Sequence, residues 1–334
     1  MGYYITPTSV LSVSAVLSAL AAIAVASRVI VRSRQAAKYG VDDWLILVSL
    51  VFTEACGISL IVGSALKGLA QPTPTGDGPM GFLTVKNDAL IITEKVNWID
   101  MLLQCLSFGL IKMSVVFFYR RIFCNPSNKG GAFDIISKIT IGFLFIWMMV
   151  FFFVVLFECK GHFWAQWDNL MALLTYCLDD SKIQLAFSWI DVITDVWILS
   201  LPLYPVWKLR LPSRQKLALC AVFLMGTLAI AAGVLRLVIY IQQLTNSFKD
   251  PDGIKVITTQ LYWSMIEMCL CTVAACLPTL KPLFNYIPID SLFSSLRTLF
   301  STNSVDLSHI EMDTYASTRR PHDGPSEGSE KSLV

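Results

Sequence analysis

FSWIDVITDVWILSLPLYPVWKL, from Phe187 to Leu209, is the stretch that decides the fold of this chain. It is apolar enough and long enough to cross a bilayer, which takes about 20 helical residues. Asp191 and Asp195 nevertheless lie inside it, and their i, i+4 spacing places both carboxylates on one helical face. Because a carboxylate facing hydrocarbon is costly, intramembrane acids face the interior of a helix bundle. The stretch therefore predicts a membrane-spanning bundle with polar groups inside it.

The composition of the whole chain agrees with a membrane protein. Of its 334 residues, 55% are hydrophobic and only 15% are charged, and the mean hydropathy is +0.61. These values lie outside the usual range of soluble globular proteins. The net charge of +2 is small and the basic residues are spread over short connections, so no nucleic-acid partner is expected. The first partner is the lipid bilayer.

Seven apolar segments have the length of a membrane span, which predicts an all-α bundle of seven transmembrane helices. The first has no basic leader before it, so we expect a retained helix and not a cleaved signal peptide. The seven segments are approximately residues 9–31, 44–66, 96–119, 139–158, 185–207, 217–241 and 258–280.

The distribution of Lys and Arg predicts the orientation of the bundle. Basic residues concentrate in alternate connections, within residues 32–38, 120–138 and 208–216. The positive-inside rule then places the N-terminus outside and the C-terminus in the cytosol. Residues 1–284 form the membrane domain, and residues 285–334, rich in polar and charged residues, form a mostly disordered cytosolic tail. A multi-pass position in an endomembrane or the plasma membrane is expected.

Two of the nine cysteines, Cys159 and Cys177, fall in the predicted outer loop between the fourth and fifth spans. An oxidising compartment on that side permits a disulfide, which would pin the loop over the mouth of the bundle. Two unpaired loop thiols are the alternative.

A series of short motifs follows the same order as the spans. These motifs are Arg28 with GVDDW (40–44), LIKMSVVFFYRRIF (110–123), FEC (157–159), YCLD (176–179), IDVITDVWILSLPLYPVWKLRLP (190–212), Arg236, WSMIE (263–267) and CLPTLKPLF (276–284). Taken together they resemble the fungal rhodopsin-domain family of seven-helix membrane proteins over roughly residues 28–284. Such proteins commonly carry Gly-x-Gly-x-His after the second helix, whereas this chain reads VGSALKGLAQ at 62–71, without histidine.

The resemblance implies two broad settings and no common mechanism. Members include receptor-like proteins of the fungal surface and membrane proteins encoded among secondary-metabolite genes, such as satratoxin-type clusters. A retinal protein is not expected here, because the seventh span has no mid-span lysine for a Schiff base and Lys281 lies at its end.

Five charged residues inside the predicted spans are expected to converge: Lys112, Asp191, Asp195, Arg236 and Glu267. Counted at the helical rise, Asp191 and Arg236 lie roughly 8 to 9 Å from the outer ends of their helices. Asp195 and Glu267 lie roughly 14 to 15 Å deep, and Lys112 roughly 24 Å. Helical side chains lean toward the N-terminus of their helix, which brings Lys112 and Arg236 toward the acids. Arg236 should pair with Asp191 or Asp195, whereas Lys112 either joins them or snorkels to the headgroups.

This set of charges has two interpretations. It could be a neutralised polar lock that keeps the helices in register, since intramembrane polar contacts contribute only about 0.6 to 2 kcal/mol each. Alternatively it lines a pocket that opens outward and has aromatic walls. The aromatic candidates are Trp98, Trp189, Trp197, Tyr240, Tyr262 and Trp263, of which Trp98 and Tyr262 also fit an interfacial belt.

The functional expectation is a membrane protein that serves a fungal secondary-metabolite pathway and binds or transforms a lipophilic intermediate. If it is catalytic, Asp191, Asp195 and Glu267 are the candidate acids of a metal-free cyclase or isomerase. No metal or cofactor is expected, because all three histidines lie in a loop and the tail. Pathway enzymes would be its protein partners.

The alternative is a receptor-like sensor of an external hydrophobic ligand, not based on retinal, which signals to a cytosolic partner through its loops. A transporter is the weakest option, because no inverted repeat or pair of broken helices is visible.

Overall fold

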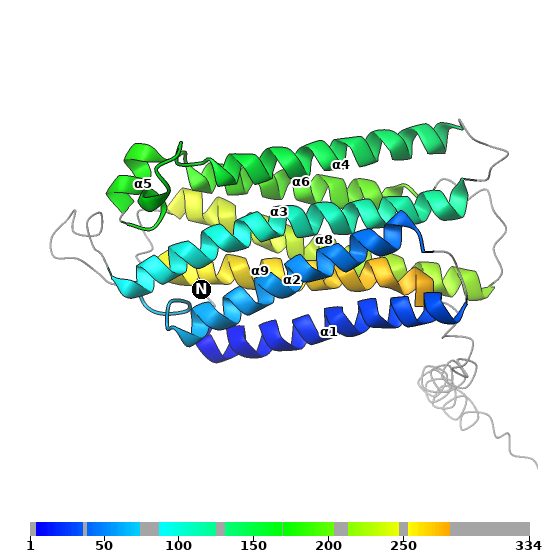
Figure 1. Cartoon of the computed structure of the whole chain (residues 1–334), viewed down its shortest axis with the longest axis horizontal. Coiled ribbons are helices and arrows are strands. Elements are labelled where there is room, and N and C mark those ends of the chain that lie inside the picture. Colours follow the sequence, from blue (N-terminus) through cyan, green and yellow to red (C-terminus); the bar gives the residue numbers. More distant parts are fainter. Residues whose placement is uncertain are drawn as a thin grey trace, which may run out of the picture. The chain divides into compact units, whose positions relative to one another are not determined.

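The computed structural model describes residues 5–35, 39–73, 87–124, 131–168, 170–203, 213–246 and 253–280. Within these ranges all regular secondary structure is helical, and seven helices are long and apolar enough to cross a membrane. Figure 1 shows these long helices side by side. The prediction of an all-α, seven-span membrane protein is confirmed.

The seven spanning helices lie close to their predicted positions. They are α1 (Pro7–Arg34), α2 (Val41–Ala65), α3 (Asp88–Phe123), α4 (Ala132–Leu156), α6 (Asp180–Ser200), α8 (Ser213–Asn246) and α9 (Gly253–Cys276). The connection between α4 and α6 holds a 3₁₀ turn, η3 (Phe163–Gln166), and a short helix, α5 (Leu170–Tyr176). A second 3₁₀ turn, η4 (Leu277–Leu280), follows α9.

Local sequence accounts for several helix ends. Thr6 caps α1 by accepting a hydrogen bond from the Ser9 amide at 3.3 Å, and Pro7 occupies the first turn, where its missing N–H costs nothing. Asn87 caps α3 in the same way. At the other end of a span, α6 stops at Ser200, just before Pro202, whose ring cannot continue a helix.

Helix α3 is the inner helix of the bundle. It packs against α2, α4, α6 and α9, and 67% of its most apolar window is buried, compared with 28% in α1 and in α4. It approaches α4 closely at Gly109, where an added Cβ would lie 2.6 Å from Met148 Sδ. Its buried face is polar along much of its length: Thr93, Asn97, Asp100, Gln104, Ser107, Lys112 and Ser114 are all buried. Large apolar side chains such as Ile23 and Ile146 are instead exposed on α1 and α4, as expected of surfaces that face lipid.

Cys159 and Cys177 form the predicted disulfide. It closes the connection between α4 and α6, where the Leu178 amide also donates to the Glu158 carbonyl at 3.0 Å. We call this end of the bundle the disulfide end and the other the opposite end. The predicted tail, residues 285–334, lies outside the described residues.

Candidate functional site

The structure brings together the five charged side chains named above, which we call the central ion cluster. Lys112 comes from α3, Asp191 and Asp195 from α6, Arg236 from α8 and Glu267 from α9. Each is at most 3% exposed except the Asp195 side chain, which is 10% exposed. Four helices therefore place their charges in one desolvated volume.

Asp191 is the hub of the cluster. Lys112 Nζ donates to Asp191 Oδ1 and to the Asp191 backbone carbonyl, both at 2.7 Å, and also to Thr194 Oγ1 at 2.8 Å. Arg236 Nη2 donates to the other Asp191 oxygen, Oδ2. One fully buried carboxylate thus holds both cations, so Asp191 joins α6 to α3 and α8 through charge-assisted hydrogen bonds.

Asp195 and Glu267 are less fully satisfied. Lys112 Nζ lies 2.8 Å from Asp195 Oδ1, but Asp195 Oδ2 has no hydrogen-bond partner. Arg236 Nη2 lies 3.2 Å from Glu267 Oε2, yet neither Glu267 oxygen makes a hydrogen bond of normal geometry. The Glu267 carboxylate lies against the backbone of α8, since a Cβ at Gly233 would approach Oε1 to 2.5 Å.

The charges of the cluster do not balance. Three carboxylates and two cations leave one formal negative charge, and an uncompensated buried charge is strongly destabilising. The cluster must therefore take up a proton, or the positive or hydrogen-donating group of a ligand. The oxygens of Asp191, Asp195 and Glu267 lie within 4.8 Å of one another, a spacing that suits a metal ion. Lys112 and Arg236, however, already bring two positive charges to that place, which opposes a second cation.

Aromatic rings cover the cluster on its disulfide side. Arg236 Cζ lies 5.0 Å from the centre of the Phe108 ring, and Lys112 Nζ lies 5.4 Å from that of Trp147. Phe187 stacks on Trp147 at 4.9 Å. Such cation–π contacts stabilise desolvated cations.

Of the aromatic residues expected around the site, Tyr240 is buried and interacts electrostatically with Arg236, but the tryptophans of α6 lie elsewhere. Trp189 and Trp197 are 47% and 49% exposed on α6, and Trp263 packs edge-on against Tyr262. Sequence reasoning did not single out Phe108, Trp147 and Phe187. A signal was present for two of them, because Phe108 and Phe187 each lie four residues before a charged member of the cluster, on the same helical face.

A cavity of about 60 Å³ borders the cluster on the side away from the disulfide. Lys112 and Asp195 form its polar edge, and its other walls are apolar or small. These other walls are Ile111, Val115, Tyr119, Ile198, Leu199, Gly226, Ala229, Cys271 and Ala274. Most of these residues lie between the cluster and the opposite end of the bundle, so the cavity extends in that direction. It does not lie on the outward side, where a pocket with tryptophan walls was expected. It has room for a few water molecules or a small polar group.

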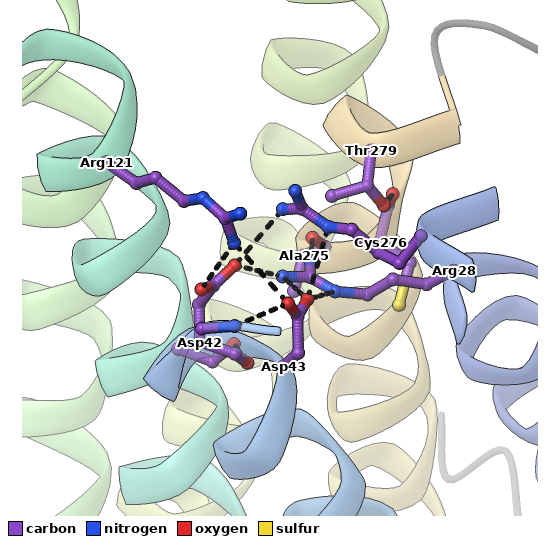
Figure 2. Close-up of polar contacts among 10 residues, drawn as sticks. Arg28, Asp42, Asp43, Arg121, Ala275, Cys276 and Thr279 are labelled. Carbon is purple, nitrogen blue, oxygen red and sulfur yellow. Dashed lines mark hydrogen bonds and ion pairs between the residues drawn. The ribbon is translucent and has the colours of Figure 1, made fainter. Parts of the chain in front are cut away.

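A second buried network, the arginine–aspartate network, lies at the opposite end of the bundle (Figure 2). Arg28 of α1 donates to Asp42 at 2.6 Å, to Asp43 at 2.9 Å and to the Ala275 carbonyl of α9 at 2.7 Å. Arg121 of α3 reaches the same two carboxylates at 3.3 and 3.5 Å. In the sequence, Arg28 and GVDDW carried only the family resemblance; in the structure they join α1, α2 and α9, and Arg121 adds α3.

These features define a multi-pass membrane protein with seven apolar helices, a disulfide-closed connection and buried ionic networks. The family model of the fungal rhodopsin domain matches residues 27–286 of this chain, and the chain belongs to that family. The resemblance inferred from the short motifs is therefore confirmed.

Curated relatives place the family in two settings. The chain is 28% identical over 291 residues to the phomoidride biosynthesis cluster protein H of Fungal sp. (strain ATCC 74256), covering 81% of this chain and 86% of the relative. It is 26% identical over 284 residues to the polyenoic acids biosynthesis gene cluster protein Ba17b of Metarhizium anisopliae, covering 82% and 73%. It is also 23% identical over 289 residues to the receptor GIN3 of Arthrobotrys oligospora, covering 86% and 65%.

Proposed function

We propose that this protein serves a fungal secondary-metabolite pathway by binding a polar group of a lipophilic intermediate between Lys112 and Asp195. The observation that carries the proposal is the cavity beside an ion cluster whose charges do not balance. Asp195 is the most exposed acid of the cluster, and its free Oδ2 is an acceptor next to the Lys112 ammonium. A ligand hydroxyl or carbonyl would find both a donor and an acceptor there.

The size of the cavity limits what it holds in this conformation. At about 60 Å³ it is far smaller than the roughly 300 to 1,000 Å³ of ordinary ligand sites. It would admit only the polar end of a ligand, while the hydrocarbon part would lie between helices or in lipid. In the catalytic version of the proposal, Asp195 donates a proton to an alkene, epoxide or carbonyl, as an acid-assisted cyclase or isomerase requires.

Two relatives support the pathway setting, because both are named for biosynthesis clusters, one of phomoidride and one of polyenoic acids. In the proposed topology the disulfide end faces the outside or an organelle lumen, since disulfides persist in oxidising compartments. The opposite end and the tail then face the cytosol, where pathway enzymes would meet the protein in an endomembrane or the plasma membrane.

The proposal is tested by deleting the gene, profiling metabolites and complementing the strain with variants. We expect the deletion to accumulate one intermediate, Asp195→Asn to fail to restore product although the protein accumulates, and Asp100→Asn to restore it. Asp100 is the matched control because it is a buried carboxyl that does not border the cavity. An unchanged metabolite profile in the deletion strain would refute the pathway role.

A receptor for an external hydrophobic ligand is the second candidate. It is favoured by the relative named receptor GIN3 and by the arginine–aspartate network, which ties together helix ends that a signalling protein would have to move. In that case the deletion strain would keep its metabolite profile and lose a response to an added compound.

A further inference from the structure

Glu158 is the most unusual acid outside the membrane spans. It follows Phe157, the C-cap residue of α4, is only 1% exposed, and neither of its carboxylate oxygens has a hydrogen-bond partner. A buried, unpartnered carboxylate is costly, so a native protein that keeps one gives it a proton or a ligand.

The disulfide holds Glu158 against other acids. Glu158 precedes Cys159, whereas Leu178, Asp179 and Asp180 follow Cys177, so the bond joins the two stretches. The hydrogen bond from the Leu178 amide to the Glu158 carbonyl fixes their register.

The charged neighbours that act on Glu158 are all acidic: Asp180, Glu94 and Asp179. Asp179 is largely exposed and forms an ion pair with Lys182 at 2.8 Å. Asp180, by contrast, accepts hydrogen bonds from the neutral amides of Gln184, at 2.7 Å, and Asn97.

Glu94 completes the group from the first turns of α3. It lies one turn before Asn97, the residue that hydrogen-bonds to Asp180, and it interacts electrostatically with Asp180. The Nζ of the neighbouring Lys95 lies over the Trp167 ring at 5.5 Å. Carboxyl groups from three elements thus meet at the disulfide end, with neutral amides beside them.

We propose that Glu94, Glu158 and Asp180 form a binding site for a hard divalent cation, best matched by calcium. Calcium takes carboxylate oxygens in flexible geometry, and these three residues supply them. The cation would offset the mutual repulsion of the three acids and tie α3, α6 and the end of α4 together. This site is separate from the central ion cluster, and the proposal does not depend on the proposed metabolite.

The oxygens of Glu94, Glu158 and Asp180 are not gathered as closely as those of the central ion cluster. Among the described residues, only the three acids of the central cluster have oxygens gathered within 4.8 Å of one another. Binding at the disulfide end would therefore draw the Glu94, Glu158 and Asp180 side chains toward one another.

Terbium luminescence tests the proposal directly, because terbium(III) replaces calcium and is excited by nearby tryptophans such as Trp98 and Trp167. In the purified full-length protein we expect a saturable signal that calcium displaces. Glu158→Gln should weaken terbium binding by at least about tenfold. The matched control, Asp88→Asn, removes an exposed carboxylate of α3 and should bind as the wild type does.

Glu94→Gln and Asp180→Asn decide the question if Glu158→Gln does not fold, and each should also weaken binding by at least about tenfold. A wild-type protein without a saturable, calcium-displaced signal overturns the proposal. So does a set of folded variants at these positions that bind terbium as tightly as Asp88→Asn.

Discussion

At the scale of single residues, the acids of the central ion cluster differ in the number of hydrogen bonds they accept from the cations of other helices. Asp191 accepts hydrogen bonds from both Lys112 and Arg236, whereas the oxygens of Glu267 accept none. Removing a negative charge at Glu267 also removes the imbalance of the cluster. The same chemical change should therefore have opposite consequences at the two positions.

We predict that Asp191→Asn destabilises the protein by about 3 kcal/mol, because two buried cations lose their shared partner. Glu267→Gln should leave the free energy of unfolding unchanged or raise it. Thermal unfolding of the detergent-solubilised variants measures both effects. Equal losses of stability at the two positions would show that the negative charge of Glu267 stabilises the fold as much as that of Asp191 does.

Glu158 gives a prediction for pH. Its pKa is raised from 4.5 to about 9 by burial and acidic neighbours, so the folded protein binds a proton that the unfolded chain releases. Because the folded state binds more protons between these values, stability should fall as pH rises from about 4.5 to 9. The slope from this group is at most about 1.4 kcal/mol per pH unit.

Glu158→Gln should remove that part of the slope and leave the variant more stable than the wild type at high pH. Melting temperatures across this pH range, measured with a chelator present, test the prediction. Parallel curves for the two proteins would contradict it.

At the scale of helices, Gly109 sets the distance between α3 and α4. An added Cβ would lie within 2.6 to 2.8 Å of three Met148 atoms, so Gly109→Ala must push the helices apart or displace Met148. We expect a loss of about 1 to 3 kcal/mol. Gly142 on α4 is the matched control, because a Cβ there meets nothing within 4 Å.

Gly142→Ala should be neutral or stabilise the helix by up to about 1 kcal/mol. Thermal unfolding of both variants gives the comparison. A Gly109→Ala protein as stable as Gly142→Ala would mean that α3 and α4 are less closely packed than the structure shows.

The helices themselves could be predicted because hydropathy and length alone mark a membrane span. Depth counting placed the five charges roughly 8 to 24 Å from the outer ends of their helices, and the lean of helical side chains toward the N-terminus was needed to bring them together. Depth does not give direction around the helix, which is why the tryptophans of α6 were misplaced. Trp189 lies two residues before Asp191 and Trp197 two after Asp195, about 200° around the helix, and so on the far face.

The partners of charges near helix ends could not be predicted. Arg28 and the two aspartates of GVDDW lie in different segments, and their meeting depends on how α1, α2 and α9 pack. For the same reason, the acids at the disulfide end became a group only when Glu94 of α3 was placed beside Asp180 of α6. Hydropathy contains no information on which spans are neighbours.

At the scale of the whole molecule, three sets of contacts join the helices at successive levels along the length of the bundle. The disulfide closes the connection from α4 to α6, the central ion cluster joins α3, α6, α8 and α9, and the arginine–aspartate network joins α1, α2, α3 and α9. Helices α3 and α9 belong to both ionic groups. A change in protonation or occupancy at the central cluster would therefore reach the opposite end through these two helices.

Arg28 is the residue on which the network at the opposite end depends most, because it is 1% exposed and contacts three separate acceptors. Arg28→Lys keeps the charge but loses the planar fork that reaches Asp42 and Asp43 together, so we predict a loss of about 2 to 4 kcal/mol. Arg34→Lys, at an exposed position less than two turns further along α1, should change stability by less than about 0.5 kcal/mol. Thermal unfolding measures both, and limited proteolysis should cut the Arg28→Lys protein sooner beside α1. If the two variants have the same melting temperature, this network does not hold the helices together. Coupling of the two ends of the bundle through α3 and α9 would then be contradicted.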